Sequence, residues 1–228
     1  MGTTTVQEKA AAGGEYVVHG APGCGSVIVE AALTLIGAPW RLVDLKNWTD
    51  VQTDPEIGRL NPQRQLPALI LPSGEVMTES AAILLRLAEA HPEAGLAPAV
   101  DAPERAQFLR WMAYIPAQIY SMYWVRDVPA RLTAGPEAAA VIRTRTAERI
   151  ADCWRMMDDQ ARPGRYVVGD TLSVLDLYVT VASRWTPRRR RFYEVAPKLA
   201  EVVRRVDAEP RLAAFWAERM PFTEGWEG

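Results

Sequence analysis

The chain has 228 residues, of which 49% are hydrophobic and 24% are charged, and this composition excludes an intrinsically disordered protein. Its 2 cysteines exclude a disulfide-dense secreted scaffold. The net charge of −2 provides no positive field for nucleic acid or an anionic membrane, and no apolar run approaches the ~20 residues needed to span a bilayer. The first residues lack the basic and apolar regions of a secretory signal. We therefore expect a cytoplasmic protein with no nucleic-acid or membrane partner.

The first part of the chain combines strand and helix patterns. Residues 1–14 are small and polar, which predicts a disordered tail. The expected strands cover 16–19, 40–44, 67–71 and 75–77. The expected helices cover 26–35, which ends before Gly37, and 81–90. The order β-α-β followed by β-β-α predicts a small α/β domain over 15–92.

The second part of the chain is dominated by the 3.6-residue period of helices. Residues 93–102 are rich in Ala, Pro and Gly, as expected for a linker. Several later prolines fall in first turns, where helices tolerate them. The expected helices cover 103–125, 136–160, 173–185, 195–208 and 210–218. Residues 103–228 are therefore predicted to form an all-helical bundle domain.

The segment NPQRQLPAL, residues 61–69, carries the most informative motif. A proline entering a strand belongs at an edge or first position, because it cannot donate to the sheet. The segment and the domain order resemble the cytosolic glutathione S-transferase family of the bacterial type, over about 15–220. The resemblance implies a thioredoxin-like domain in which Pro67 is cis and contacts glutathione, and in which Leu66 pairs its backbone with the cysteinyl part of glutathione. The loop before it is expected to add polar contacts from Gln63 and Gln65.

A second match lies at Thr78-Glu79-Ser80, just before an expected helix. Ser80 is a natural N-cap, and the free amides and dipole of a helix start suit a carboxylate ligand. Taken alone, this is the cap of a structural helix. Together with the resemblance, it implies that Glu79 and Ser80 hold the γ-glutamyl end of glutathione.

A third match, VGDTLSVLD over 168–176, resembles the start of a helix in the family's second domain. Ser173 is followed three positions later by Asp176, which is an acidic variant of the capping box. This pattern indicates folding and stability rather than chemistry.

The candidate catalytic residues follow the first expected strand, where Cys24 and Ser26 precede a helix. A helix start stabilises a bound or intrinsic thiolate. The family keeps its activating Ser, Tyr or Cys at this place, and either residue matches part of that pattern. If Ser26 acts, the reaction is conjugation to an electrophile. If Cys24 acts, a mixed disulfide with glutathione and reductive chemistry become possible.

The first expected helix of the second domain carries a stripe of aromatic residues. Such a stripe more often packs in a core, and the spacing shows that its members do not all share one face. The family places its electrophile pocket on this helix, which implies a bulky apolar or aromatic co-substrate. The residues expected to line the pocket are Tyr114, Trp111, Tyr120 and Tyr123, with Tyr114 first.

Two further features are interpreted as structural. Arg188–Arg191 form a basic run, which we read as a solvated face, with an anionic co-substrate or acidic partner as the alternative. His19 and His91 have no partners at metal-ligand spacing, so we expect no metal site.

These patterns together predict a glutathione S-transferase that uses glutathione as co-substrate and transfers an alkyl or aryl group to it. One alternative is a glutathione-disulfide oxidoreductase or reductive lyase that uses Cys24. Another is a non-catalytic glutathione-binding or interaction protein with the same fold. The resemblance also implies a homodimer that acts in detoxification or in a dedicated pathway.

Overall fold

The computed structural model describes residues 14–46 and 48–228, which form two compact units. The first unit contains the described residues up to Ala94 together with Glu209–Phe222, and the second contains Gly95–Ala208 and Thr223–Gly228. The predicted disordered tail lies outside the described residues, except for Gly14. The predicted helical domain over 103–228 needs one correction, because Glu209–Phe222 packs with the first unit. Helical periodicity shows that a segment has an apolar face but not which core receives it.

The first unit is built on a four-stranded sheet with strand order β2-β1-β3-β4. β1 pairs in parallel with β2 and antiparallel with β3, which pairs antiparallel with β4. Val18, in the middle of β1, lies opposite Leu42 on one side and Leu69 on the other. The strands are β1 (Tyr16–Gly20), β2 (Trp40–Asp44), β3 (Ala68–Ile70) and β4 (Val76–Met77). The predicted thioredoxin-like βαβ-ββα fold is confirmed.

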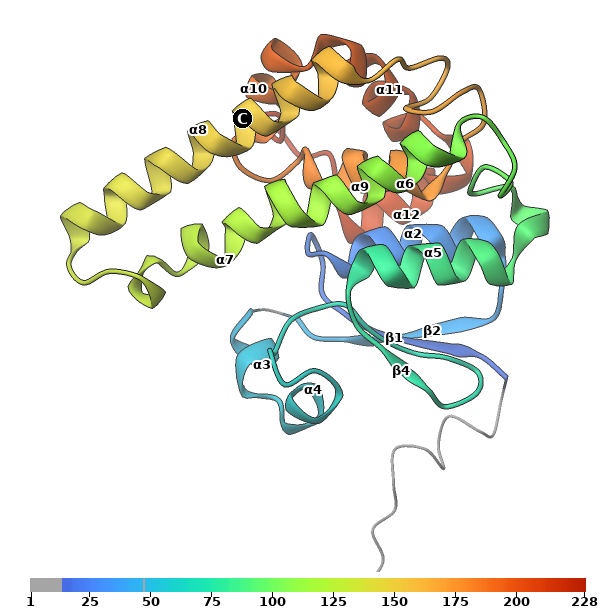
Figure 1. The fold of residues 1–228 in the computed structure, drawn as a ribbon. Coiled ribbons are helices and arrows are strands. Elements are labelled where there is room, and N and C mark those ends of the chain that lie inside the picture. Colours follow the sequence, from blue (N-terminus) through green and yellow to red (C-terminus); the bar gives the residue numbers. More distant parts are fainter. Residues whose placement is uncertain (1–13, 47) are drawn as a thin grey trace, which may run out of the picture. The chain divides into compact units, whose positions relative to one another are not determined.

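Helices cover the two faces of this sheet, as Figure 1 shows. α2 (Ser26–Ile36) and α5 (Ser80–Ala90) pack together on one face. On the other face, Leu60 of α4 (Pro55–Leu60) belongs to a buried cluster with Val17 of β1. The first unit also contains α3 (Trp48–Thr53), a 3-10 turn at Pro92–Ala94, another at Pro210–Leu212, and α12 (Ala213–Arg219).

The sequence did not lead us to expect α3 and α4, although α4 carries recognisable start signals. Asp54 is its N-cap, and the side chain accepts hydrogen bonds from the backbone N–H of Glu56 and Ile57. Pro55 occupies the first helical position. At six residues the helix is too short for periodicity to reveal it.

The second unit is helical, as predicted. The predicted helix over 103–125 is divided into α6, a π-helical stretch that contains Pro116, and α7. Because proline has no N–H to donate, it is poorly accommodated in a regular α-helix and better in a locally widened one. The elements are α6 (Arg105–Tyr114), the π stretch (Ile115–Tyr120), α7 (Ser121–Asp127), a 3-10 turn (Pro129–Arg131), α8 (Pro136–Gln160), α9 (Val174–Ala182), α10 (Arg188–Val195) and α11 (Pro197–Asp207).

The capping box at the start of α9 is confirmed. The Ser173 backbone N–H and hydroxyl both donate to Asp176 Oδ2, each at 2.7 Å. The backbone N–H of Val167 donates to Asp176 Oδ1 at 2.8 Å. Both residues of the box are buried, and the loop before α9 is tied to the helix through the same carboxylate.

The basic run forms the start of α10, and one of its members is not solvated. Arg189 is fully buried and donates to both carboxylate oxygens of Asp207 and to the backbone oxygen of Thr180. The interpretation of the whole run as a solvated face was therefore wrong for Arg189. A buried arginine requires a matching carboxylate, and Asp207 lies too far along the chain for local spacing to suggest it.

Candidate functional site

The turn between β1 and α2 brings the candidate catalytic residues to the start of a helix. Gly23 adopts φ +69°, which is the left-handed region that favours glycine, and its backbone N–H donates to the backbone oxygen of Arg219 at 3.0 Å. At Gly20 a Cβ would lie 2.7 Å from Glu30 Oε1 and closer still to Ser26 Oγ. Only glycine fits there, so the end of β1 can approach α2 closely enough to place these polar groups together.

Ser26 is the first residue of α2, and its side chain is fully buried. Its hydroxyl donates to Glu30 Oε1 at 2.6 Å and accepts a hydrogen bond from the backbone N–H of Ala21 at 3.1 Å. Cys24 Sγ lies 3.2 Å from the same hydroxyl oxygen. Ser26 therefore holds the turn against the helix.

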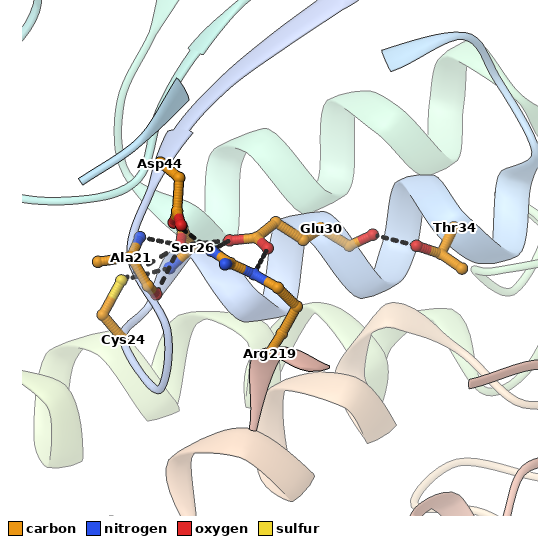
Figure 2. A network of polar contacts seen from close by, with 7 residues as sticks. All are labelled: Ala21, Cys24, Ser26, Glu30, Thr34, Asp44 and Arg219. Carbon is orange, nitrogen blue, oxygen red and sulfur yellow. Dashed lines mark hydrogen bonds and ion pairs between the residues drawn. The ribbon is translucent and has the colours of Figure 1, made fainter. Parts of the chain in front are cut away.

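Glu30 and Arg219 form a buried ion pair that links α2 to α12. Arg219 Nε donates to Glu30 Oε2 at 2.6 Å, and its Nη2 lies 3.0 Å from Asp44 Oδ1 on β2. Burial raises the pKa of Glu30, while hydrogen bonds from Arg219 and Ser26 act in the opposite direction. Ser26, Glu30, Arg219 and Asp44 are called the α2 polar network below, and Figure 2 shows it from close by.

Cys24 is a half-buried free thiol beside this network. Its sulfur accepts a hydrogen bond from the backbone N–H of Ser26 at 3.4 Å. Burial raises the pKa of the Cys24 thiol, and the nearby charge of Glu30 acts in the same direction. The hydrogen bond with the Ser26 side chain and the backbone hydrogen bonds with Ser26 and Ala21 oppose this shift without overcoming it, so the protonated thiol is the favoured form at neutral pH.

Leu66 belongs to the same hydrophobic cluster against which Cys24 packs. The peptide bond from Leu66 to Pro67 is cis, which confirms the prediction from the NPQRQLPAL segment. Neither the N–H nor the C=O of Leu66 is hydrogen-bonded within the described part of the chain. The structure thus brings together residues from the cysteine turn and the proline motif that are far apart in the sequence.

The loop before Leu66 is fixed by Asn61. The Asn61 side-chain amide donates to the backbone oxygen of Gln65 at 3.0 Å and accepts from the backbone N–H of Gln63 at 3.1 Å. The side chain of Gln63 is exposed and that of Gln65 is half-buried. These two predicted contact residues therefore lie on a pre-organised loop next to the Leu66 backbone.

Glu79 and Ser80 lie at the start of α5, with one change from the prediction. Glu79 rather than Ser80 is the N-cap, and Ser80 is the first helical residue. Glu79 is exposed and adopts φ +63°, a conformation that a glutamate rarely takes. Backbone strain of this kind concentrates at binding and active sites.

The predicted pocket residues of the second unit divide by burial. Trp111 and Tyr123 are buried, and the Tyr123 hydroxyl donates to the backbone oxygen of Thr186 at 2.8 Å. Tyr114 and Tyr120 are half-buried, so they are the members of the set with accessible surface. Tyr114 donates to the backbone oxygen of Cys153 at 3.0 Å, and Tyr120 lies in the π stretch.

Sequence reasoning missed Glu30 and Arg219. A glutamate in the apolar stretch SVIVEAALTLI was the available signal, because a charge on a buried helix needs a partner. Its partner is 189 positions away, and no local pattern identifies it.

The described residues contain neither a cluster of metal-ligating side chains nor a membrane-spanning helix. In that part of the chain, no three or more His, Cys, Asp or Glu side chains are grouped as a metal site would require. None of its helices combines the length and apolarity needed to cross a membrane.

Two family models match the chain. The model described as "Glutathione S-transferase, N-terminal domain" matches residues 26–90, and the model described as "Glutathione S-transferase, C-terminal domain" matches residues 133–219. The first match begins at Ser26, so it includes Leu66, Glu79 and Ser80 but not Cys24.

The chain is also similar to known proteins over most of its length. An uncharacterized GST-like protein of Escherichia coli K12, YncG, is 31% identical over 86% of this chain and 94% of its own length. A glutathione transferase homologue from Sulfitobacter, solved with bound glutathione, is 24% identical with a TM-score of 0.80, over 91% of this chain and 99% of its own. A beta-class glutathione S-transferase from Sphingomonas chungbukensis is 23% identical with a TM-score of 0.73, over 90% of this chain and 99% of its own.

Proposed function

Because this chain belongs to the glutathione S-transferase family, we propose that it binds glutathione in its first unit and activates the glutathione thiol for attack on an apolar or aromatic electrophile. The observation that carries the proposal is the shared cluster of Cys24 and Leu66. Because Cys24 packs against the cluster that contains Leu66, a thiol and the open Leu66 backbone N–H and C=O belong to one region, which supports a site for the cysteinyl part of glutathione.

Glutathione would be held mainly by backbone and polar groups of this unit. The Leu66 backbone would pair with its cysteinyl part as an added strand does. Glu79 and Ser80 would hold the γ-glutamyl end, where the Glu79 carboxylate suits an ammonium group and the first amides of α5 suit a carboxylate. Gln63 and Gln65 would add polar contacts from the fixed loop, next to Pro67.

Activation means lowering the pKa of the bound glutathione thiol. A thiol with an ordinary pKa of ~8.5 is only a few per cent ionised at pH 7, and a fall of two units corresponds to about 2.7 kcal/mol. The start of α2 and a hydrogen bond from the Cys24 S–H to the glutathione sulfur would both stabilise the thiolate. Ser26 is less suited to this role, because it is fully buried and its proton is donated to Glu30.

The conjugation itself forms one sulfur–carbon bond. Glutathione releases its thiol proton to solvent, and the thiolate attacks an electrophilic carbon. A leaving group then departs with the electrons of its bond, or the proton is regained after addition to a double bond. Tyr114 and Tyr120 are the side chains we propose for an aromatic co-substrate.

A half-buried free thiol at this position also favours a second candidate, disulfide exchange. Cys24, as a thiolate, would attack a mixed disulfide between glutathione and a substrate, take up the glutathionyl group and release the substrate thiol. A second glutathione would then attack the Cys24 mixed disulfide and leave as oxidised glutathione, which restores Cys24. This route needs the deprotonated form of Cys24, which burial disfavours.

Titration of glutathione into the protein by calorimetry at neutral pH tests the binding step. We expect a dissociation constant between micromolar and millimolar, and the absence of binding would overturn the proposal. Cys24→Ala then separates the two reactions, because it should abolish disulfide exchange, in which the Cys24 sulfur is the nucleophile, but only weaken conjugation, in which its S–H is one of two groups that stabilise the thiolate. Sedimentation of the same samples tests the homodimer that the family implies.

A further inference from the structure

The Ser26 hydroxyl has a complete set of hydrogen bonds, and this fixes which way each bond runs. A hydroxyl has one proton to donate and two lone pairs with which to accept. The proton points to Glu30 Oε1 at 2.6 Å instead of the Ala21 backbone oxygen at 3.4 Å, because the carboxylate is the nearer acceptor and can only accept. One lone pair receives the backbone N–H of Ala21, and the other faces Cys24 Sγ at 3.2 Å.

In the absence of glutathione, the Cys24 thiol must therefore donate to Ser26. A thiolate at Cys24 would face a lone pair instead of a proton, unless the hydroxyl turned away from Glu30. That turn would leave a fully buried carboxylate with fewer donors. From this geometry we propose that Glu30, acting through Ser26, is a positioning residue that holds Cys24 in its thiol form and so favours conjugation over disulfide exchange.

The charged groups around Cys24 are consistent with this role. Glu30 faces it from α2 and adds a negative charge beside the sulfur. Arg219 from α12 is engaged with the carboxylates of Glu30 and Asp44. Its guanidinium opposes the rise in the pKa of Glu30 that burial causes, and so favours the ionised carboxylate, which is an acceptor for Ser26.

Glu30→Gln reverses the direction of the chain of hydrogen bonds. The side-chain carbonyl of the introduced glutamine can accept from Arg219, and its amide can donate to Ser26 Oγ. Both lone pairs of Ser26 are then occupied, one by the Ala21 N–H and one by this amide. The hydroxyl proton turns to Cys24 Sγ at 3.2 Å, which is nearer than the Ala21 backbone oxygen at 3.4 Å. A hydrogen bond to a thiolate stabilises it, and the midpoint of the Cys24 titration should fall by about one pH unit.

The experiment measures the pH profile of Cys24 alkylation by iodoacetamide. A Cys153→Ser background leaves Cys24 as the only cysteine of the chain. Ser26→Ala removes the acceptor of the thiol proton but keeps the backbone N–H of residue 26, so the midpoint of the Cys24 alkylation profile should also fall in this variant. Thr34→Val is the matched control, because it removes a hydroxyl that bonds the Glu30 backbone at 2.8 Å and leaves the α2 polar network intact.

The double variant Glu30→Gln/Ser26→Ala distinguishes an effect of Glu30 through Ser26 from a direct effect of the Glu30 charge on Cys24. If Glu30 acts through Ser26, Glu30→Gln should have little further effect in the Ser26→Ala background. An equal shift in both backgrounds would show that only the charge of Glu30 matters and would overturn the proposal. So would an unchanged midpoint in Glu30→Gln, or a raised midpoint in Ser26→Ala, which would make Ser26 a donor to the thiolate.

Thermal melts decide whether each variant is folded. If Glu30→Gln does not fold, Ser26→Ala carries the test, because it leaves the Glu30–Arg219 pair in place, and any result other than a fallen midpoint overturns the proposal. The inference on reaction choice rests on the proposed function. The alkylation profile requires no glutathione, so a failure of glutathione binding does not affect it.

Discussion

The starts of α2 and α9 each have a buried serine followed within four residues by a buried acid, but the two acids have different hydrogen-bond partners. At α9 the Asp176 carboxylate is held by the backbone N–H groups of Ser173 and Val167 and by the Ser173 hydroxyl. At α2 the Glu30 carboxylate is held by the side chains of Arg219 and Ser26. The first arrangement fixes a loop to a helix, and the second connects a charge to a side chain next to a thiol.

The difference between the two sites is therefore one of partners rather than of residue type. Burial raises the pKa of both acids. At α9 two of the three donors to the acid are backbone amides, whose positions the fold fixes. At α2 the donors to the acid are side chains, and the hydroxyl among them lies beside a thiol that can ionise, as a role in chemistry requires.

The largest expected effect comes from Arg219→Met, which leaves Glu30 buried without its cation. Removing one member of a buried ion pair costs about 3–5 kcal/mol. We expect a loss of that size in the free energy of unfolding, measured by urea denaturation at pH 7. Arg211→Met is the matched control, because Arg211 lies in the same segment, Glu209–Phe222, but its side chain is 58% exposed in its pair with Glu209. A loss below 1 kcal/mol in both variants would contradict the prediction.

Asp176→Ala should be the next most destabilising change. It leaves the backbone N–H groups of Val167 and Ser173 without acceptors and removes half of the capping box, at a cost of about 2–4 kcal/mol. The same urea experiment measures it. Asp170→Ala provides the comparison, since Asp170 accepts from the backbone N–H of Arg165 in the same loop but is exposed. Equal losses in the two variants would show that burial of the acid is not what matters.

The pH dependence of the free energy of unfolding should show that Asp176, the acid at the start of α9, is buried. Burial raises the pKa of Asp176 from 3.8 to about 6. The folded state therefore binds the Asp176 proton more tightly than the unfolded state does, and protonation of Asp176 contributes about 2–3 kcal/mol to the free energy of unfolding. This contribution is fully present below about pH 3.8 and is lost as the pH rises through about 6. Asp176→Asn should remove that dependence. Unfolding curves at pH 4 and pH 7 would contradict this if the wild type and the variant changed in parallel.

The sequence predicted those parts of the molecule that local patterns encode. The four strands, α2, α5 and the capping box at Ser173 follow from alternation, turn residues and spacing within a few positions. The cis bond before Pro67 was implied by the resemblance that the local segment NPQRQLPAL carries. The α2 polar network and the placement of Glu209–Phe222 do not, because they depend on a pair separated by 189 residues. Arg189 shows the same limit, since its run looks solvated until Asp207 is placed beside it.

A third helix start, that of α5, extends the comparison to an acid that is exposed. Glu79 adopts φ +63°, and glycine takes this conformation without the strain that a side chain adds. Glu79→Gly should therefore raise the free energy of unfolding by up to about 1 kcal/mol. It should also weaken glutathione binding about tenfold, because a charge-assisted hydrogen bond to the γ-glutamyl ammonium is lost.

The opposite signs of these two effects are the diagnostic feature. Replacing a residue that only caps a helix lowers the stability of the protein. Replacing a strained residue that is retained for a ligand lowers the affinity for that ligand and raises the stability. Calorimetry with glutathione and urea unfolding measure the two quantities on the same sample. Glu75→Ala, which removes another exposed acid of the first unit, should change neither. Unchanged glutathione affinity in Glu79→Gly would place α5 with α9, as a helix start that serves folding alone.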